Sequence, residues 1–181
     1  MNPLNSPVIW FTGLSGAGKT TTARALLKRL QAAGRQVELL DGDELRATIS
    51  KGLGFSREDR MDNIRRMVYI SKLLSRNDVT VLVSAITPYR EMRDYARSEL
   101  PGYVEIFVDC PLTECERRDV KGLYAKARET KLANFTGISD PYELPEMPDL
   151  TVRTDLESLD NNVDQIMSYL ARCGQKRRES V

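Results

Sequence analysis

The sequence predicts an α/β fold of three layers, in which helices cover both faces of a five-stranded, mainly parallel sheet. Apolar runs of strand length recur along the chain with helix-length segments between them, and this alternation is typical of a parallel sheet. Residues 13–20 read GLSGAGKT, which matches the phosphate-binding pattern G-x-x-x-x-G-K-[ST] between an apolar run and a helical segment. The two observations together predict the P-loop NTPase form of this fold, with a lid segment.

The expected strands are continuous apolar runs, as strands covered on both faces should be. They are Val8–Phe11, Val37–Leu40, Val79–Val83, Val104–Val108 and Leu150–Val152. The first helix should follow the loop to Ala33 and stop at Gly34, a normal C-terminal signal. Another should begin after residues 56–59, SRED, which resemble a capping box. Its core residues at helical spacing are Met61, Ile64, Met67, Val68 and Leu74.

A single P-loop kinase domain is expected over residues 1–181, because no repeat, low-complexity tract or linker divides the chain. The segment 117–148 differs from the rest, since it is charged, contains several glycines and prolines and lacks an expected strand. Long segments of this type are often lids over active sites. The alternative is an ordinary surface excursion.

Composition excludes several classes of function. The 27 basic and 26 acidic residues give a formal net charge of +1, so no global field attracts nucleic acid or an anionic membrane. No signal-peptide pattern is present, and no run approaches the roughly 18 apolar residues of a membrane span. Cys110, Cys115 and Cys173, in a chain without histidine, form no zinc or disulfide pattern. We therefore expect a cytoplasmic protein with no nucleic-acid and no membrane partner.

The loop predicts a grip on nucleotide phosphates. Its glycines let backbone N–H groups turn inward on the β-phosphate, where the helix N-terminus adds partial positive charge. Lys19 should reach the β- and γ-phosphates, and the Thr20 hydroxyl should ligate Mg²⁺. The residues expected to bind the nucleotide here are Gly13, Leu14, Ser15, Gly16, Ala17, Gly18, Lys19, Thr20 and Thr21.

Acidic residues follow the second expected strand, at the edge where open α/β sheets bind ligands. If the chain stays extended across Gly42, Asp41 and Asp43 point to the same side. A carboxylate there can order Mg²⁺ or accept the proton of an attacking hydroxyl, and Arg46 can bind an anionic acceptor. The alternative makes Asp43 a helix N-cap and Arg46 a solvated charge.

Three further groups are candidates for the same crevice. Phe55 could stack on a base, with Arg60 and Asn63 on one helix face, or it could be a core residue beside a polar outer face. A Thr-Pro turn follows the third strand and is a weak signal by itself. Along residues 115–128, read as a helix, three cations would lie near one face and could close over phosphates. They are Arg118, Lys121 and Arg128, and a solvated helix face is the alternative.

Taken together, these motifs resemble the adenylylsulfate kinase family. The matching blocks are GLSGAGKTT, LDGDELR, GFSREDRMDNIRR, ITPYR, PLTECERRDVKGLYAKAR and FTGISDPYELP, in the family's order over nearly the whole chain. The resemblance implies ATP and Mg²⁺ as cofactors and phosphorylation of the 3′-hydroxyl of adenosine 5′-phosphosulfate. It implies catalytic roles for Lys19 and for Asp43 near that hydroxyl, and Arg118 near the ATP adenine. On the acceptor side it places Phe55 against the adenine, and it assigns the phosphosulfate end to Arg46, Arg60, Asn63 and Lys121. The other residues that it implies for acceptor binding are Asp43, Ile86 and Thr87, with Phe135, Thr136 and Gly137 of the lid.

The chain departs from the family's pattern at Thr87, where many members carry a serine that is phosphorylated in some of them, so such a role is doubtful here. The N-terminal extension common in relatives, and any contact it makes, is not expected. A homodimer and a separate ATP sulfurylase partner fit the resemblance. Two rival readings stay open, another small-molecule P-loop kinase with a different acceptor and a catalytically silent nucleotide-binding regulator. The absence of an Asn-Lys-x-Asp element weakens a GTPase reading.

Overall fold

The computed structural model describes residues 6–129 and 134–178, with side chains as far as residue 174. Within them, five strands pair in one all-parallel sheet in the order β2-β3-β1-β4-β5. The strands are β1 (Val8–Thr12), β2 (Val37–Asp41), β3 (Thr80–Ser84), β4 (Tyr103–Asp109) and β5 (Leu150–Arg153). All five expected strands are confirmed. Each of the five ends one residue later than expected, at a polar residue on the carboxyl edge of the sheet.

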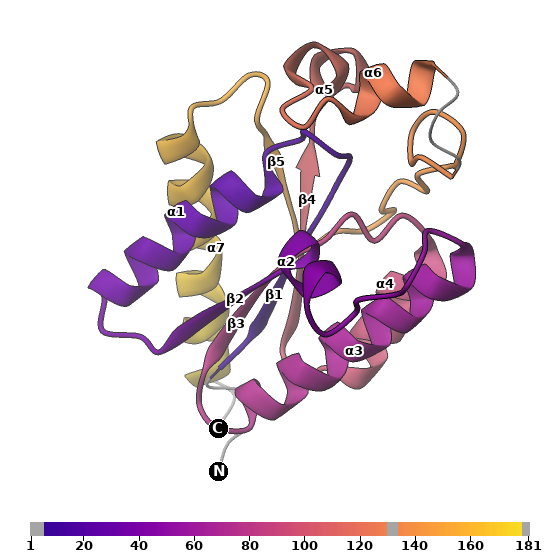
Figure 1. The fold of residues 1–181 in the computed structure, drawn as a ribbon. Coiled ribbons are helices and arrows are strands. Elements are labelled where there is room, and N and C mark those ends of the chain that lie inside the picture. Colours follow the sequence, from indigo (N-terminus) through magenta and orange to yellow (C-terminus); the bar gives the residue numbers. More distant parts are fainter. Residues whose placement is uncertain (1–5, 130–133, 179–181) are drawn as a thin grey trace.

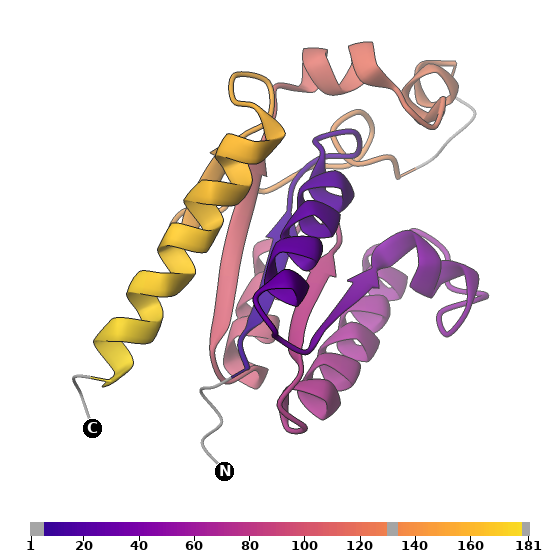
Figure 2. The ribbon, with the colours of Figure 1, turned by 90° about the vertical axis from the view of Figure 1, so that its left-hand side faces the viewer.

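Helices cover both faces of the sheet, which confirms the three layers (Figures 1 and 2). Side chains alternate between faces along a strand, so Ile9 and Phe11 pack in one core and Val8 and Trp10 in the other. The first core is closed by α1 (Lys19–Ala32) and α7 (Leu159–Arg178). The second is closed by α3 (Arg57–Ser75) and α4 (Arg90–Glu99).

The expected helix signals hold at α1 and α3. Gly34, just beyond α1, has a positive φ of 76°, as a C-terminal glycine should. Ser56 is the N-cap of α3, and its Oγ accepts a hydrogen bond from the Asp59 N–H at 3.1 Å. Of the apolar residues expected in the core, Ile64, Met67 and Val68 are buried. Met61 and Leu74 are partly buried against them.

Three short helices lie beyond the carboxyl edge of the sheet: α2 (Gly42–Ala47), α5 (Leu112–Arg118) and α6 (Leu123–Arg128). The single helix expected over residues 115–128 is therefore wrong. Asp119 and Gly122 have positive φ values of 21° and 62° between α5 and α6. The Asp119 carboxylate accepts hydrogen bonds from the N–H groups of Tyr124 and Ala125, both at 3.0 Å, which stabilises the start of the second helix.

The structure also bears on the expectations about membrane spans, thiols and metal-binding clusters. In the part of the chain that the structure describes, no helix is both long and apolar enough to cross a bilayer. Cys110 and Cys115 are buried free thiols, and Cys173 is partly buried. Over the same residues, no group of three or more metal-ligating histidine, cysteine or carboxylate side chains is found.

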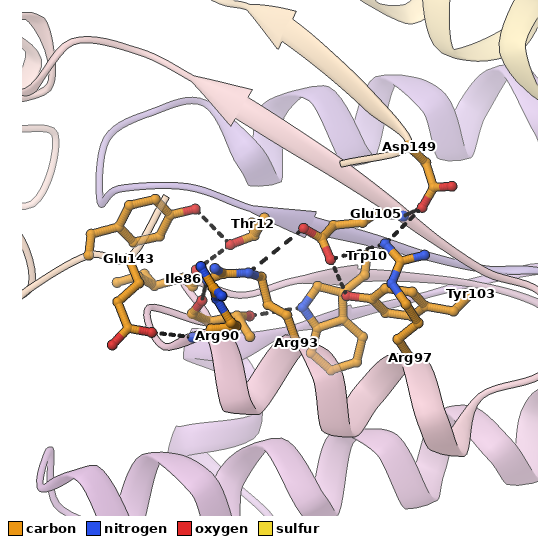
Figure 3. Close-up of polar contacts among 12 residues, drawn as sticks. Trp10, Thr12, Ile86, Arg90, Arg93, Arg97, Tyr103, Glu105, Glu143 and Asp149 are labelled. Carbon is orange, nitrogen blue, oxygen red and sulfur yellow. Dashed lines mark hydrogen bonds and ion pairs between the residues drawn. The ribbon is translucent and has the colours of Figure 1, made fainter. Parts of the chain in front are cut away.

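A buried polar network fastens α4 to β4 beneath the carboxyl edge (Figure 3). Glu105 is 4% exposed and lies between two guanidinium groups, with Oε1 3.8 Å from Arg93 Nε and Oε2 3.4 Å from Arg97 Nη2. The Tyr103 hydroxyl donates to the same carboxylate at 3.3 Å. Asp149, just before β5, accepts from the Glu105 N–H at 2.8 Å and pairs with Arg97 at 3.1 Å. Burial raises the pKa of Glu105, an effect that the two arginines oppose.

Replacing Glu105 should destabilise the fold. Glu105→Gln preserves the shape of the side chain but leaves the buried Arg93 without its counter-charge, so the free energy of unfolding should fall by about 3 kcal/mol. Urea unfolding at neutral pH measures this change. The control Glu38→Gln removes an exposed carboxylate of β2 and should change the free energy by less than about 0.5 kcal/mol. Equal stability of the two variants would contradict the role of this ion pair.

Candidate active site

A cavity of about 580 Å³ opens at the carboxyl edge of the sheet. Its wall comes from the phosphate-binding loop, α2, α3, the turn after β3, the connection between α5 and α6, residues 134–136 and the start of α7. Segments far apart in sequence therefore meet there, as the rule for open α/β sheets predicts.

The phosphate-binding loop is fixed by its first glycine. Gly13 has a φ of 150°, and a Cβ added there would lie 2.5 Å from the carbonyl oxygen of Val108. No side chain fits such an approach, so glycine is required at this position. The Gly13 N–H donates to the carbonyl of Ile86 at 3.4 Å. The loop is thereby held between the end of β4 and the turn after β3.

Lys19 begins α1 and is buried beneath the loop. Its Nζ donates hydrogen bonds to the carbonyl oxygens of Gly13 at 3.0 Å and Leu14 at 2.7 Å. Burial, together with the positive charge of Lys121, lowers the pKa of Lys19 to about 8. A phosphate group placed on the loop would supply the negative charge that this desolvated ammonium lacks.

Three oxygen ligands suited to Mg²⁺ gather beside the loop. The Thr20 hydroxyl donates to Asp41 Oδ2 at 2.7 Å and lies 3.0 Å from Ser84 Oγ. Carboxylate and hydroxyl oxygens are ligands that this ion accepts, together with phosphate oxygens and water. The sequence offered a carboxylate of Asp41 or Asp43 as a group that could order Mg²⁺, whereas Ser84 was not expected at the metal site. The available signal was that both residues end neighbouring strands, where they are partners in register.

The two acidic residues of this segment have different environments. Helix α2 begins at Gly42, so the chain does not stay extended there and the expectation that Asp41 and Asp43 point to the same side is not met. Asp41 is buried and is the N-cap, because its Oδ1 accepts from the Asp43 N–H at 2.9 Å. The alternative that made Asp43 the cap is wrong. Asp43 is exposed, lines the cavity and pairs with Lys121.

Two of the three cations expected on one helix face reach the cavity. Arg118 donates to the Thr154 carbonyl at 2.8 Å and to the Gly16 carbonyl at 3.4 Å, so it lies across the end of the loop. Lys121 lines the cavity in the connection between α5 and α6. Arg128 pairs with Glu116 at 2.6 Å and is not part of the wall, because the break between the helices turns it away.

Another part of the wall is formed by α2, α3 and the segment between them. Phe55 is 55% exposed, so the alternative that made it a core residue is wrong. The guanidinium carbons of Arg46 and Arg60 lie 4.5 and 5.6 Å from the centre of its ring. Arg60 and Asn63 are buried, and both line the cavity, as their spacing on one face of α3 predicted.

Two buried polar atoms of residues that line the cavity lack a hydrogen-bond partner among the described residues. Asn63 Oδ1 and Thr136 Oγ1 have no hydrogen-bond partner among the described residues. Buried polar groups are normally bonded, and an exception in a cavity wall indicates a place for a ligand or water.

Side chains of β1 and α4 fix the turn after β3 by hydrogen bonds (Figure 3). The Ile86 carbonyl accepts the Thr12 hydroxyl at 2.7 Å, and Thr87 has an unusual φ of 50°. The buried Thr87 hydroxyl accepts from Trp10 Nε1 at 2.8 Å, and its carbonyl accepts from Arg93 Nη1 at 3.0 Å. Both turn residues line the cavity, but the Thr87 hydroxyl is already engaged in the core.

Residues 135–137 divide between two sides of the loop. Phe135 and Thr136 line the cavity, and the rings of Phe135 and Tyr124 form a T-shaped pair with centres 5.0 Å apart. Gly137 lies outside the cavity wall, beside Leu14 and Leu112.

Most of the predicted nucleotide-binding residues line the cavity, namely Ser15, Gly16, Gly18, Lys19, Thr20, Thr21 and Arg118. The others belong to the loop without lining the cavity, and they are Gly13, Leu14 and Ala17.

Several residues of the cavity wall were not among those predicted from the sequence. Tyr124 supports the loop through a hydrogen bond from its hydroxyl to the Ser15 carbonyl at 2.9 Å. The other missed residues of the wall include Thr154, Leu159 and Asn162.

Comparison with known proteins gives a consistent result. A family model described as adenylylsulphate kinase matches residues 5–153. The adenylyl-sulfate kinase of Picosynechococcus sp. is 57% identical over 166 residues, which cover 92% of this chain and 94% of that protein. That of Chloroflexus aurantiacus is 58% identical over 165 residues, covering 91% and 89%. The solved structure of the Mycobacterium tuberculosis APS kinase, in complex with AMPPNP and APS, matches with a TM-score of 0.88 and 42% identity over 92% of this chain and 98% of that one.

The lowered pKa of Lys19 predicts a pH dependence of nucleotide binding. A bound nucleotide favours the charged lysine, so binding above pH 8 must take up a proton. The dissociation constant for ATP should rise by up to about tenfold per pH unit above pH 8. Calorimetry in buffers of different ionisation enthalpy measures both quantities. Lys19→Arg stays charged over this range and should lose the dependence. Equal pH slopes for the two proteins would contradict the assignment to Lys19.

Proposed function

The chain belongs to the adenylylsulphate kinase family, and we propose that its cavity holds ATP with Mg²⁺ over the loop and adenosine 5′-phosphosulfate against α3. As an adenylyl-sulfate kinase, the protein transfers the γ-phosphoryl group of ATP to the 3′-hydroxyl of adenosine 5′-phosphosulfate. The products are 3′-phosphoadenosine 5′-phosphosulfate and ADP. The observation that carries the placement is one continuous cavity that joins the loop to Phe55, Arg60 and Asn63.

On the donor side, the loop N–H groups and Lys19 would bind the β- and γ-phosphates. Thr20 and Asp41 would hold Mg²⁺, either directly or through water. The ion, when bound, neutralises charge on the phosphates during transfer. Arg118, which lies across the end of the loop at Thr154, would approach the adenine of ATP.

On the acceptor side, the exposed ring of Phe55 offers a stacking surface for a base. Arg46, Arg60 and Lys121 supply positive charge for the phosphosulfate group. The unpartnered Asn63 Oδ1 can accept a hydrogen bond from the nucleoside, and the unpartnered Thr136 hydroxyl can donate or accept one.

Transfer itself depends on positioning and charge, because the transition state is loose. Asp43 lines the cavity and would orient the 3′-hydroxyl and accept its proton. Its partner Lys121 holds the carboxylate before substrate binds. An anionic acceptor that engages Lys121 would release Asp43 for this task. A cytoplasmic location, a homodimer and a separate ATP sulfurylase partner stay predictions.

An acceptor panel tests this assignment. The protein with Mg²⁺ and ATP should release ADP rapidly with adenosine 5′-phosphosulfate, and mass spectrometry should identify the 3′-phosphorylated product. Sugars, shikimate and nucleosides in the same assay represent other P-loop kinases. Faster turnover with one of these acceptors would favour that rival. Tight ATP binding without turnover on any acceptor would favour a silent regulator.

Asp43→Asn should lower kcat by about 100-fold or more, because the amide cannot accept the proton of the hydroxyl. The KM for ATP should change little, since the hydrogen bonds of Asp43 among the described residues run to Asp41 and Lys121 and not to the loop backbone. The matched control is Glu44→Gln, which changes the next residue, an exposed carboxylate outside the cavity wall. Near-normal kcat in Asp43→Asn would exclude Asp43 as the base.

A further inference from the structure

Asp140 forms an ion pair with Arg60 from outside the cavity wall. Its side chain is 13% exposed, and Oδ2 lies 3.8 Å from Nη2 of Arg60, whose side chain is 8% exposed. The hydroxyl of the buried Tyr89 donates to the carboxylate and lies 2.8 Å from each of its oxygens. Asp140 itself is not part of the cavity wall.

The backbone of Asp140 closes a tight turn that carries part of the wall. Its carbonyl accepts from the Gly137 N–H at 2.7 Å, and its N–H donates to the Phe135 carbonyl at 3.1 Å. Arg60 Nη2 donates to the Asn134 carbonyl at the start of the same turn. The turn of residues 134–140 is thus joined to α3 through Arg60 and to the start of α4 through Tyr89, its N-cap residue.

The hydrogen bonds fix the orientation of the guanidinium. Arg60 Nε donates to the Phe55 carbonyl at 2.9 Å, and Nη2 faces Asn134 and Asp140. Within the described residues, the hydrogen bonds of Arg60 therefore use Nε and Nη2, which leaves the Nη1 N–H groups for a ligand. Burial lowers the pKa of Arg60, and the charge of Asp140 opposes that effect. Without the carboxylate, the buried cation would lose its counter-charge and its fixed position.

We propose that Asp140 is a positioning residue that holds Arg60 ready for the acceptor and ties the 134–140 turn to it. Tyr89 orients the Asp140 carboxylate. The inference rests on the proposed binding of adenosine 5′-phosphosulfate by Arg60. The residues 134–136 and the guanidinium then form one unit of the acceptor wall, and loss of Asp140 affects the acceptor while sparing ATP.

A double-mutant cycle tests the proposal with steady-state kinetics. Asp140→Asn should lower kcat/KM for adenosine 5′-phosphosulfate about tenfold, through KM, with the KM for ATP unchanged. Because Asp140 acts through Arg60, the same change in an Arg60→Ala background should add less than about twofold. Full additivity of the two effects, or an equal rise of both KM values, would overturn the proposal.

Two more variants keep the result interpretable. Tyr89→Phe removes only the hydroxyl donor and should shift the same KM in the same direction by a smaller factor. It replaces Asp140→Asn in the cycle if that protein fails to fold. Asp62→Asn removes a half-exposed carboxylate of α3 that pairs with Arg65, and its kinetics should match the parent protein.

The experiments distinguish failure of the proposed function from failure of the proposed role of Asp140. No turnover of adenosine 5′-phosphosulfate by the parent protein overturns the proposed function. Normal kinetics of Arg60→Ala overturns the role of Arg60 and this inference with it. A defective Arg60→Ala beside normal Asp140→Asn and Tyr89→Phe overturns the inference alone.

Discussion

The site depends on the close approach of the Gly13 backbone to the Val108 carbonyl. This contact places the start of the phosphate-binding loop against the end of β4, while the Gly13 N–H reaches the Ile86 carbonyl beyond β3. Because the loop is anchored to strands on both sides of β1, its carbonyls are in place to hold Lys19. The anchoring also sets the donor side of the cavity at a fixed position relative to the turn that bears Ile86 and Thr87. The donor side and this turn of the cavity wall are therefore positioned by the same backbone contacts.

The sheet and the donor side could be predicted from sequence for a simple physical reason. Strands buried on both faces must be continuously apolar, so their positions are visible in one dimension. The phosphate-binding loop is also local, since its glycines, Lys19 and Thr20 act within eight consecutive residues. The polar residues that end the strands, such as Asp41 and Ser84, were visible too. Their pairing needs the strand order, which places β2 beside β3.

The rest of the site depends on contacts between segments far apart in sequence. The break between α5 and α6 was missed, because helical periodicity says nothing of a side chain such as Asp119 that caps a second helix within the same segment. That break decides which cations face the cavity, with Lys121 at Asp43 and Arg128 turned to Glu116. The contact between Arg60 and Asp140 joins residues 80 positions apart, and no spacing rule reports it. Local patterns identified the residue types of the acceptor wall, while long-range pairing sets their geometry.

The backbone at Thr87 adopts a strained conformation that lowers the stability of the fold and shapes the cavity wall. Among the described non-glycine residues with positive φ, the others are Asp78, Asp119 and Asn134, residue types that tolerate this conformation, whereas Thr87 is β-branched. Such a conformation costs on the order of 1–3 kcal/mol and persists only where its surroundings enforce it. Here Trp10 and Arg93 enforce it from the core. The core beneath the turn therefore sets the shape of the site as well as the packing of the fold, so a change at Trp10 or Arg93 would alter both.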